Sequence, residues 1–405
     1  MKTFLTRRTL TVAMLAALTV SIPAIAQKRY DTGASDTEIK IGNIVPYSGP
    51  VAAYGTIGKV SAAYMAKINA EGGINGRKVN FISVDDAYTP SKTVEQARKL
   101  VEQDEVLAIY GALGTSHNMA IQKYMNAKKV PQLFVVSGAS HWGDVKQNPW
   151  TIGWQPTLTT EGRAFSQRIL KLRPNAKVAV LMQNDDFGKD FFKGVLEGLG
   201  DKSKSAIVSH QTYEVTDPTI DSQIVTMKAA GADSLIIIAT PKFAAMAIKK
   251  SAEIGWQPDR YLSSVSMSIS ATLKPAGLDI SKGVISASYL RETSDPAVQA
   301  SKEYQEYAAF MKQYYPGGDV NDVFNVVGYT CAQTLVQVLK QAGDNLTREN
   351  VMKQALNLNL NLPMLYPGIK IQTTPTDAYP IQQTQLMQFN GTRYEPIGGV
   401  LGSPN

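Results

Sequence analysis

Residues 38–45 read EIKIGNIV, a stretch in which polar and apolar side chains first alternate and then give way to apolar ones. This pattern predicts a β-strand that enters a buried sheet. In the next segment apolar residues recur at helical spacing, and the segment stops at Glu71-Gly72-Gly73. This is typical of a helix that ends at glycine. A second strand is predicted from Val79 to Val84. Strand, helix and strand in this order are the unit from which parallel sheets with covering helices are built.

The same alternation continues in two series. The first series adds helices at 90–101 and 116–127 and strands at 106–110 and 131–136. After a turn-rich stretch, the second series has strands at 178–182, 206–214 and 234–238 and helices at 160–172, 187–199, 219–230 and 241–254. Later helices are predicted at 297–315, 322–341 and 348–356, with strands near Ile369 and Gln385. The chain is therefore predicted to hold two α/β units, with a ligand cleft facing the carboxyl ends of their strands.

Composition excludes several classes of protein. The chain has 405 residues, 44% hydrophobic and 19% charged, which is enough apolar material for a large core and excludes disorder as the main state. Beyond residue 26 there are 38 basic and 34 acidic side chains, a net charge of +4. A chain so nearly balanced, with no basic cluster, gives no support to nucleic-acid binding. Cys331, the single cysteine, lies in an apolar segment and is predicted to be a buried thiol.

Residues 1–26 have the pattern of a signal peptide. Lys2, Arg7 and Arg8 precede an apolar stretch at 10–20, and the segment closes on Ala24-Ile25-Ala26. The stretch is shorter than the roughly 20 apolar residues of a membrane-spanning helix, so cleavage after Ala26 is favoured over a membrane anchor. The arginine pair leaves the general secretory and twin-arginine routes open. We expect a periplasmic protein, since no later segment is long and apolar enough to span a bilayer.

The sequence contains no recognisable catalytic or metal site. Three histidines are scattered without metal-ligand spacing, and one cysteine cannot complete a zinc site. Ser140, His141 and Asp144 include the residue types of a catalytic triad, but triad groups converge from different elements, and there is no Gly-x-Ser-x-Gly motif. We therefore expect neither an enzyme nor a bound cofactor or metal.

The turn from Gly111 to Thr115 is the best candidate for an anion site. It follows a predicted strand and precedes a predicted helix, where exposed N–H groups bind anions. It lacks the lysine of a phosphate loop and the third glycine of a dinucleotide motif, so it suits a carboxylate better than a nucleotide. The alternative is a tight turn in which Thr115 or Ser116 caps the helix.

Several motifs carry a resemblance to a known family. They are Ser48-Gly49-Pro50 and Tyr54-Gly55 after the first strand, the run INAEGGING at 68–76, and Asp85-Asp86 after the second strand. Together they resemble the branched-chain amino acid binding proteins of ABC importers, over nearly the whole chain beyond residue 26. The run at 68–76 is the most specific part.

The resemblance implies a type I periplasmic binding (Venus-flytrap) fold. Two Rossmann-like lobes are joined by three crossing strands, and a ligand is closed between them. On this basis residues 37–154 and 286–380 form the N-terminal lobe, and residues 155–285 and 381–405 form the C-terminal lobe. We expect a monomer that delivers its ligand to ABC permease subunits in the membrane.

The resemblance also implies site residues on both lobes. An aromatic wall falls on Tyr54, and a second aromatic falls on Phe187, whose alternative role is simple packing at its helix start. The groups that hold a ligand carboxylate fall on the turn before the helix at 116–127 and on the segment 137–140. The full predicted set of ligand-binding residues is Tyr54, Gly114, Thr115, Ser116, Ser137, Gly138, Ser140, Phe187 and Thr240.

The part of the site that should bind the amino group of a ligand departs from the family pattern. The stretch that should supply an acid for the ligand ammonium is Leu262 to Ser268, which contains none. A buried ammonium without an anionic partner is costly, so a small carboxylate without an amino group is favoured, for example an aromatic or other organic acid. Two alternatives stay open: a branched-chain or related amino acid with Asp186 as its partner, and a ligand-sensing module that signals through a membrane protein.

Overall fold

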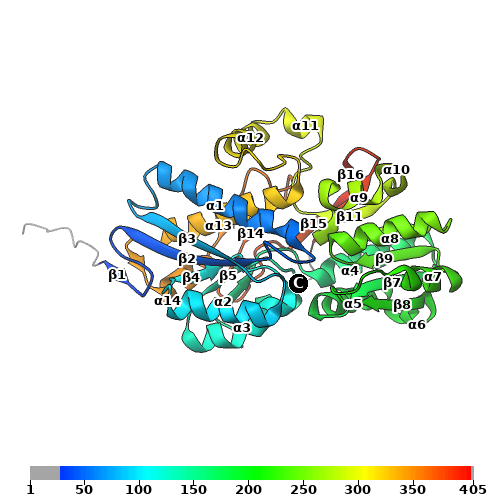
Figure 1. Ribbon diagram of the computed structural model, residues 1–405, viewed down its shortest axis with the longest axis horizontal. Helices are drawn as coiled ribbons and strands as arrows, with labels where there is room; N and C mark the ends of the chain where they lie inside the picture. Colours follow the sequence, from blue (N-terminus) through cyan, green and yellow to red (C-terminus); the bar gives the residue numbers. More distant parts are fainter. Residues whose placement is uncertain (1–27, 403–405) are drawn as a thin grey trace, which may run out of the picture.

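Two α/β lobes lie side by side along the long axis of the molecule (Figure 1). The computed structural model describes residues 28–402, so the predicted signal peptide lies outside the described residues. We call the part built on the five-stranded sheet the first lobe and the part built on the seven-stranded sheet the second lobe. The predicted α/β class with parallel-sheet lobes is confirmed.

The sheet of the first lobe is parallel throughout, in the order β3-β2-β4-β5-β6. Its strands are β2 (Glu38–Val45), β3 (Lys78–Asp85), β4 (Ala108–Tyr110), β5 (Gln132–Val135) and β6 (Thr151–Gly153). In β2 the residues alternate between half-buried and buried up to Ile41, and all are buried from there to Val45. The sequence pattern of this strand therefore corresponds to its burial.

Helices cover both faces of this sheet. On one face lie α1 (Gly55–Ala70) and α13 (Val323–Ala342), and on the other α2 (Pro90–Glu102) and α3 (Thr115–Lys128). A Cβ added at Gly328 would lie 2.6 Å from the carbonyl oxygen of Ile57, so only glycine lets α13 approach α1 this closely. The helix α13 comes from late in the chain and completes a core begun by the first half.

The sheet of the second lobe has the order β16-β15-β11-β10-β9-β7-β8. Its strands are β7 (Val178–Gln183), β8 (Ile207–Tyr213), β9 (Ser234–Ile238), β10 (Asp259–Leu262), β11 (Ile285–Ser288), β15 (Gln383–Phe389) and β16 (Tyr394–Gly402). β15 runs antiparallel to β11 and to β16, while the other pairs are parallel. One face is covered by α4 (Leu158–Leu172) and α5 (Asp186–Leu199), the other by α7 (Asp221–Ala229) and α8 (Pro241–Glu253).

Within residues 28–402 the chain passes between the lobes three times. It leaves the first lobe after β6, returns after β11 to the helices that pack on the first core, and crosses again before β15. The exact lobe boundaries given above stay a prediction. The three connections between the lobes form the hinge, and they come from segments far apart in the sequence.

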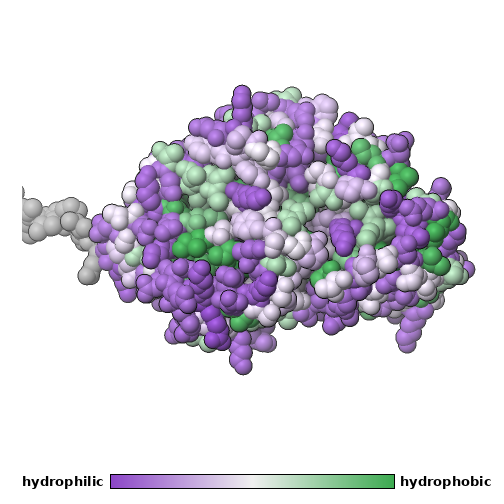
Figure 2. All heavy atoms as spheres, viewed as in Figure 1, coloured by the Kyte–Doolittle hydropathy of each residue, from purple (hydrophilic) through white to green (hydrophobic). Residues whose placement is uncertain are grey.

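Shorter elements complete the lobes. They are β1 (Arg29–Tyr30), η1 (Ala52–Tyr54), η2 (Ser140–Gly143), η3 (Gly200–Lys202), α6 (Ser203–Ala206), η4 (Ser264–Ser266), η5 (Ile269–Leu273), α9 (Lys274–Ala276), α10 (Leu278–Ser281), β12 (Asn345–Leu346), α14 (Arg348–Ala355), β13 (Asn359–Leu360) and β14 (Ile371–Gln372). Among the described residues, no helix has both the length and the apolarity to cross a bilayer. Figure 2 shows hydrophilic residues over most of the viewed face, with apolar residues in small groups.

The prediction of one helix over 297–315 is wrong. The segment forms α11 (Pro296–Gln299) and α12 (Lys302–Tyr314). Ser301 breaks it, because its side chain accepts a hydrogen bond from the backbone N–H of Tyr304 and so begins a new helix. The buried position of Cys331 in α13 is confirmed.

Candidate functional site

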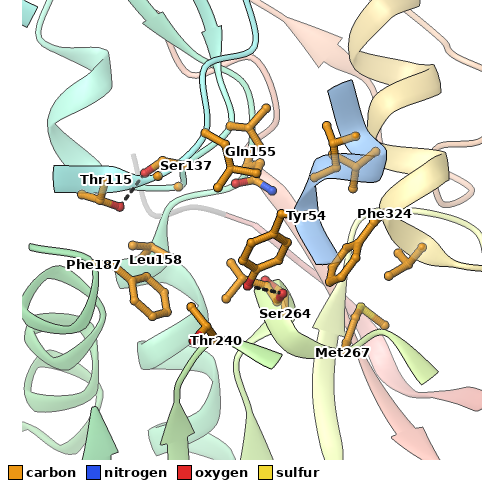
Figure 3. Close-up of a pocket in the computed structure, with 18 of the residues that line it drawn as sticks. Tyr54, Thr115, Ser137, Gln155, Leu158, Phe187, Thr240, Ser264, Met267 and Phe324 are labelled. Atoms are coloured by element: carbon orange, nitrogen blue, oxygen red, sulfur yellow. Dashed lines mark hydrogen bonds between the residues drawn. The ribbon is translucent and has the colours of Figure 1, made fainter. Parts of the chain in front are cut away.

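A cavity of about 720 Å³, a volume that includes its open mouth, lies between the two lobes. Both sheets direct loops toward it, and the returning helix α13 closes one side (Figure 3). None of the described residues that line it is Asp, Glu, His, Lys or Arg. Any charge on a ligand must therefore be compensated by dipoles.

Most of the residues proposed from the sequence meet at this cavity. The lining includes Tyr54, Gly114, Thr115, Ser137, Gly138, Phe187 and Thr240. The other two proposed residues, Ser116 and Ser140, are not part of the lining.

Ser116 and Ser140 instead connect the two lobes. The hydroxyl of Ser116 donates to Asp186 Oδ2 at 3.0 Å. The hydroxyl of Ser140 donates to Asp190 Oδ1 at 2.5 Å, and its N–H donates to Oδ2 at 2.9 Å. The two acids are four residues apart on α5, so one face of this helix receives both serines of the first lobe. Since their hydroxyls are occupied, neither serine is free to hold a ligand in this conformation.

Thr115 presents a free hydroxyl proton to the cavity. Ser137 Oγ accepts from Trp142 Nε1 at 3.0 Å and from the N–H of Ala139 at 3.3 Å, which uses both of its lone pairs. In the 2.7 Å contact between Ser137 Oγ and Thr115 Oγ1, Ser137 must therefore be the donor. The hydroxyl of Thr115 is left to donate to a ligand.

The start of α3 adds backbone donors beside this hydroxyl. The N-cap is Gly114, with φ at 101° and no side-chain cap, so the alternative in which Thr115 or Ser116 caps the helix is wrong. The N–H groups of a first helical turn have no partner within the helix and favour an anion. Behind them His117 is 2% exposed, its ring lies 4.0 Å from that of Tyr88, and burial lowers its pKa, which keeps it neutral.

The middle of the cavity is apolar and aromatic. Tyr54 meets Phe324 edge to face, with ring centroids 4.9 Å apart, and Phe187 and Met267 continue the wall from the second lobe. The hydroxyl of Tyr54 donates to the carbonyl oxygen of Val265 at 2.9 Å, so it also joins the lobes. Phe187 both lines the cavity and packs in the core beneath α5.

Gln155 and Tyr289 are cavity residues that sequence reasoning missed. Gln155 Nε2 donates to the hydroxyl of Tyr289 at 3.1 Å. Both residues lie on segments where the chain passes between the lobes, after β6 and after β11. No local motif marks such positions, because their proximity depends on the path of the whole chain.

A buried carboxyl group adjoins the cavity behind Ser264. Glu161 on α4 is 6% exposed and accepts the N–H of Ser264 at 2.6 Å and its hydroxyl at 2.7 Å. Burial raises the pKa of Glu161 to about 8. Ser264 lines the main cavity and also a smaller cavity that includes Glu161. Asp186, the acid named as an alternative ammonium partner, lies outside the lining of the main cavity.

Metal binding finds no support in the described part of the chain. No group of three or more His, Cys, Asp or Glu side chains there is arranged to hold a metal ion.

Comparison with known proteins agrees with this architecture. A family model described as periplasmic binding protein matches residues 38–393. The Leu/Ile/Val-binding protein homolog 7 of Brucella abortus (strain 2308) is 22% identical over 334 residues, which cover 78% of this chain and 81% of that relative.

Solved structures share the fold. A branched chain amino acid ABC transporter protein from Thermus thermophilus with bound valine has a TM-score of 0.80 at 16% identity, covering 92% of this chain and 97% of that chain. A fatty acid ABC transporter substrate-binding protein from Thermomonospora curvata has a TM-score of 0.77 at 20% identity, covering 93% and 95%. The type I periplasmic binding fold and the resemblance to branched-chain amino acid binding proteins are confirmed.

Proposed function

This chain belongs to the periplasmic binding protein family, and we propose that it is the extracytoplasmic solute-binding component of an ABC importer. The family is one of binding proteins rather than enzymes, and relatives of similar length are named as ABC transporter proteins. One observation carries the proposal: a cavity between two lobes, lined by both, with hydrogen-bond donors gathered at one end. The signal-peptide pattern predicted at residues 1–26 supports export to the periplasm.

The ligand class that fits best is a carboxylate with an apolar, and in particular an aromatic, body. The Thr115 hydroxyl and the first turn of α3 supply donors for the carboxylate. Tyr54, Phe187 and Phe324 supply apolar surface for the body. An ammonium group would find no anionic side chain on the cavity wall, and burying it unpaired is costly.

A thermal-shift screen tests this ligand class. The panel contains aromatic acids, aliphatic acids and amino acids at equal concentration. A ligand that binds only the native state stabilises it by about 2.7 kcal/mol at a hundred times its Kd, so binders stand out clearly. We expect the largest shifts from organic acids without an amino group. Leucine or valine shifting the unfolding temperature more than every such acid would contradict the ligand class.

We also propose that the ligand acts by holding the lobes closed and that the permease recognises this closed form. The cross-lobe bonds of Tyr54, Ser116 and Ser140 support a closed arrangement in the described structure. Each lobe alone offers half of the cavity wall, so a ligand satisfied from both sides shifts the equilibrium toward closure. Small-angle scattering should give a smaller radius of gyration with a saturating binder than without it. An unchanged radius would contradict closure by the ligand.

A second candidate is an amino acid binding protein of the same type. It is favoured by Glu161, a buried acid that forms no ion pair with any cation among residues 28–402 and lies next to the cavity behind Ser264. The names of the relatives, Leu/Ile/Val-binding and valine-bound, point the same way. The same screen separates the two candidates.

A further inference from the structure

We propose that Ser264 and Glu161 form a second polar subsite of the ligand cavity, in which a proton on Glu161 turns the Ser264 hydroxyl into a donor toward the ligand. The inference rests on the proposed function and names the chemistry of the ligand more closely. It extends the binding site from the Thr115 end to the opposite wall of the cavity (Figure 3).

The geometry is a two-point contact between one carboxyl group and one residue. The N–H of Ser264 reaches Glu161 Oε1 at 2.6 Å, and Ser264 Oγ lies 2.7 Å from Oε2. Glu161 is 6% exposed, while Ser264 is half-buried and lines the main cavity. Ser264 therefore lies between the buried carboxyl group and the main cavity.

Two protonation states satisfy this contact in different ways. When Glu161 is ionised, both the N–H and the O–H of Ser264 donate to it, and Ser264 Oγ offers only lone pairs to the cavity. When Glu161 is protonated, its carbonyl oxygen accepts the N–H and its O–H donates to Ser264 Oγ. The Ser264 proton is then free to point into the cavity. One proton gained by Glu161 thus reverses one hydrogen bond and exposes one donor.

The surroundings favour the protonated state at neutral pH. Burial raises the pKa of Glu161 to about 8, and no described Lys, Arg or His forms an ion pair with it. The cation nearest in sequence on the same helix, Arg163, is bonded to Glu197 at 2.5 Å. Tyr289 lines the smaller cavity together with Glu161, and burial raises the pKa of its phenol, so it is neutral as well.

The ligand class that follows is a carboxylate with a second hydrogen-bond-accepting oxygen. One oxygen acceptor meets the Ser264 donor, while the carboxylate meets Thr115 and the start of α3. An ammonium group is a donor only, so the freed Ser264 proton offers it nothing and it meets only a remaining lone pair of Ser264 Oγ. The 2-oxo acids are the simplest members of the class.

Two matched trios of probes test the inference by calorimetry. They are phenylglyoxylate, phenylacetate and phenylglycine, and 3-methyl-2-oxobutanoate, 3-methylbutanoate and valine. Within each trio only the group beside the carboxylate changes. At pH 6.5 we expect the oxo acid to bind about three- to tenfold more tightly than the plain acid, as one neutral hydrogen bond provides. At pH 9 the preference should vanish.

Two variants distinguish the effect of the Glu161 proton on Ser264 from general effects of pH on binding. Ser264→Ala should lose the preference for the oxo acid at both pH values. Glu161→Gln should keep it at both, because its amide donates to Ser264 Oγ as the protonated acid does. A preference that persists at pH 9 in the parent protein, or in Ser264→Ala, overturns the inference. The inference is also overturned if valine or phenylglycine binds most tightly in its trio and Glu161→Gln weakens that binding.

The ligand-free protein gives a second readout. An infrared band of a protonated carboxyl group should be present at pH 6.5, disappear by pH 9.5 and be missing in Glu161→Gln. If none of the six probes binds, the proposed ligand class fails, and this titration alone decides the inference. An ionised Glu161 at pH 6.5 overturns it.

Discussion

The two polar ends of the cavity use the same residue type in opposite ways. At the Thr115 end, two N–H donors saturate Ser137 and fix the direction of the Thr115 hydroxyl at any pH near neutrality. At the Ser264 end, the partner is a carboxyl group, which accepts or donates according to its proton. The difference shows that the neighbour, rather than the hydroxyl itself, decides what a ligand meets. The predictions below test this comparison from its largest expected effect to its smallest.

Gly114→Ala should abolish measurable binding of the best carboxylate in the screen. The added Cβ would lie 2.5 Å from His117 Nδ1, and φ is 101°, so the start of α3 must move. Gly231→Ala is the matched control, because its φ is also positive and its added Cβ meets nothing within 4 Å. Gly231→Ala should lose about 1–2 kcal/mol of unfolding free energy from its positive φ, and Gly114→Ala should lose more because of the added close contact, but only Gly114→Ala should lose binding. Calorimetry and thermal denaturation measure the two effects, and normal affinity in Gly114→Ala would remove α3 from the site.

Thr115→Ala should weaken carboxylate binding by about ten- to a hundredfold, since a hydrogen bond to a charged group contributes about 1.5–3 kcal/mol. Thr115→Ser keeps the hydroxyl and should retain most of the affinity. Stability should change little in either variant. Equal affinities for the alanine and serine variants would show that the hydroxyl is not used.

Trp142→Phe tests how the direction of the Thr115 hydroxyl is fixed. Without Nε1, Ser137 has a free lone pair and can accept from Thr115 instead of donating to it. We expect about three- to tenfold weaker carboxylate binding. Trp154→Phe is the control, because its Nε1 donates to Thr334 Oγ1 instead. The argument about lone pairs fails if both variants bind as the parent does.

The last expected effect is on stability rather than on ligand binding, and it comes from Glu161. Its pKa is about 8 in the folded protein and near 4.5 when unfolded, so the folded state binds the proton more tightly between these values. Unfolding free energy should therefore fall as pH rises from about 4.5 to 8. Ligand-free Glu161→Gln should show a weaker fall in unfolding temperature over this interval than the parent. Parallel curves for the two proteins would mean that Glu161 does not titrate there.

Local patterns predict the lobes and the Thr115 end of the site, but not the Ser264 end. The strand at 38–45 and the turn before α3 carry their own signals, since periodicity and glycine spacing are properties of neighbouring residues. Glu161 and Ser264 are 103 residues apart and meet only because α4 and the loop after β10 pack in one lobe. Nothing near either residue indicates this pairing.

Ser116 and Ser140 show a different limit of sequence reasoning. Their residue types and positions beside the cavity suit a ligand carboxylate. In the described arrangement, however, their hydroxyls donate to the acids of α5 instead. Sequence motifs can place a hydroxyl near a site, but they cannot show which of two acceptors it meets when the lobes come together.

A cavity wall without charged side chains also bears on how quickly a solute is unloaded. A carboxylate held by N–H and O–H dipoles leaves no unpaired countercharge behind when it departs. Dipole attraction also weakens faster with distance than the attraction between two full charges. A small parting of the lobes is then enough to admit water, which takes over the same hydrogen bonds. If the proposed function is correct, a modest pull on one lobe would empty the cavity without the work of separating a salt bridge.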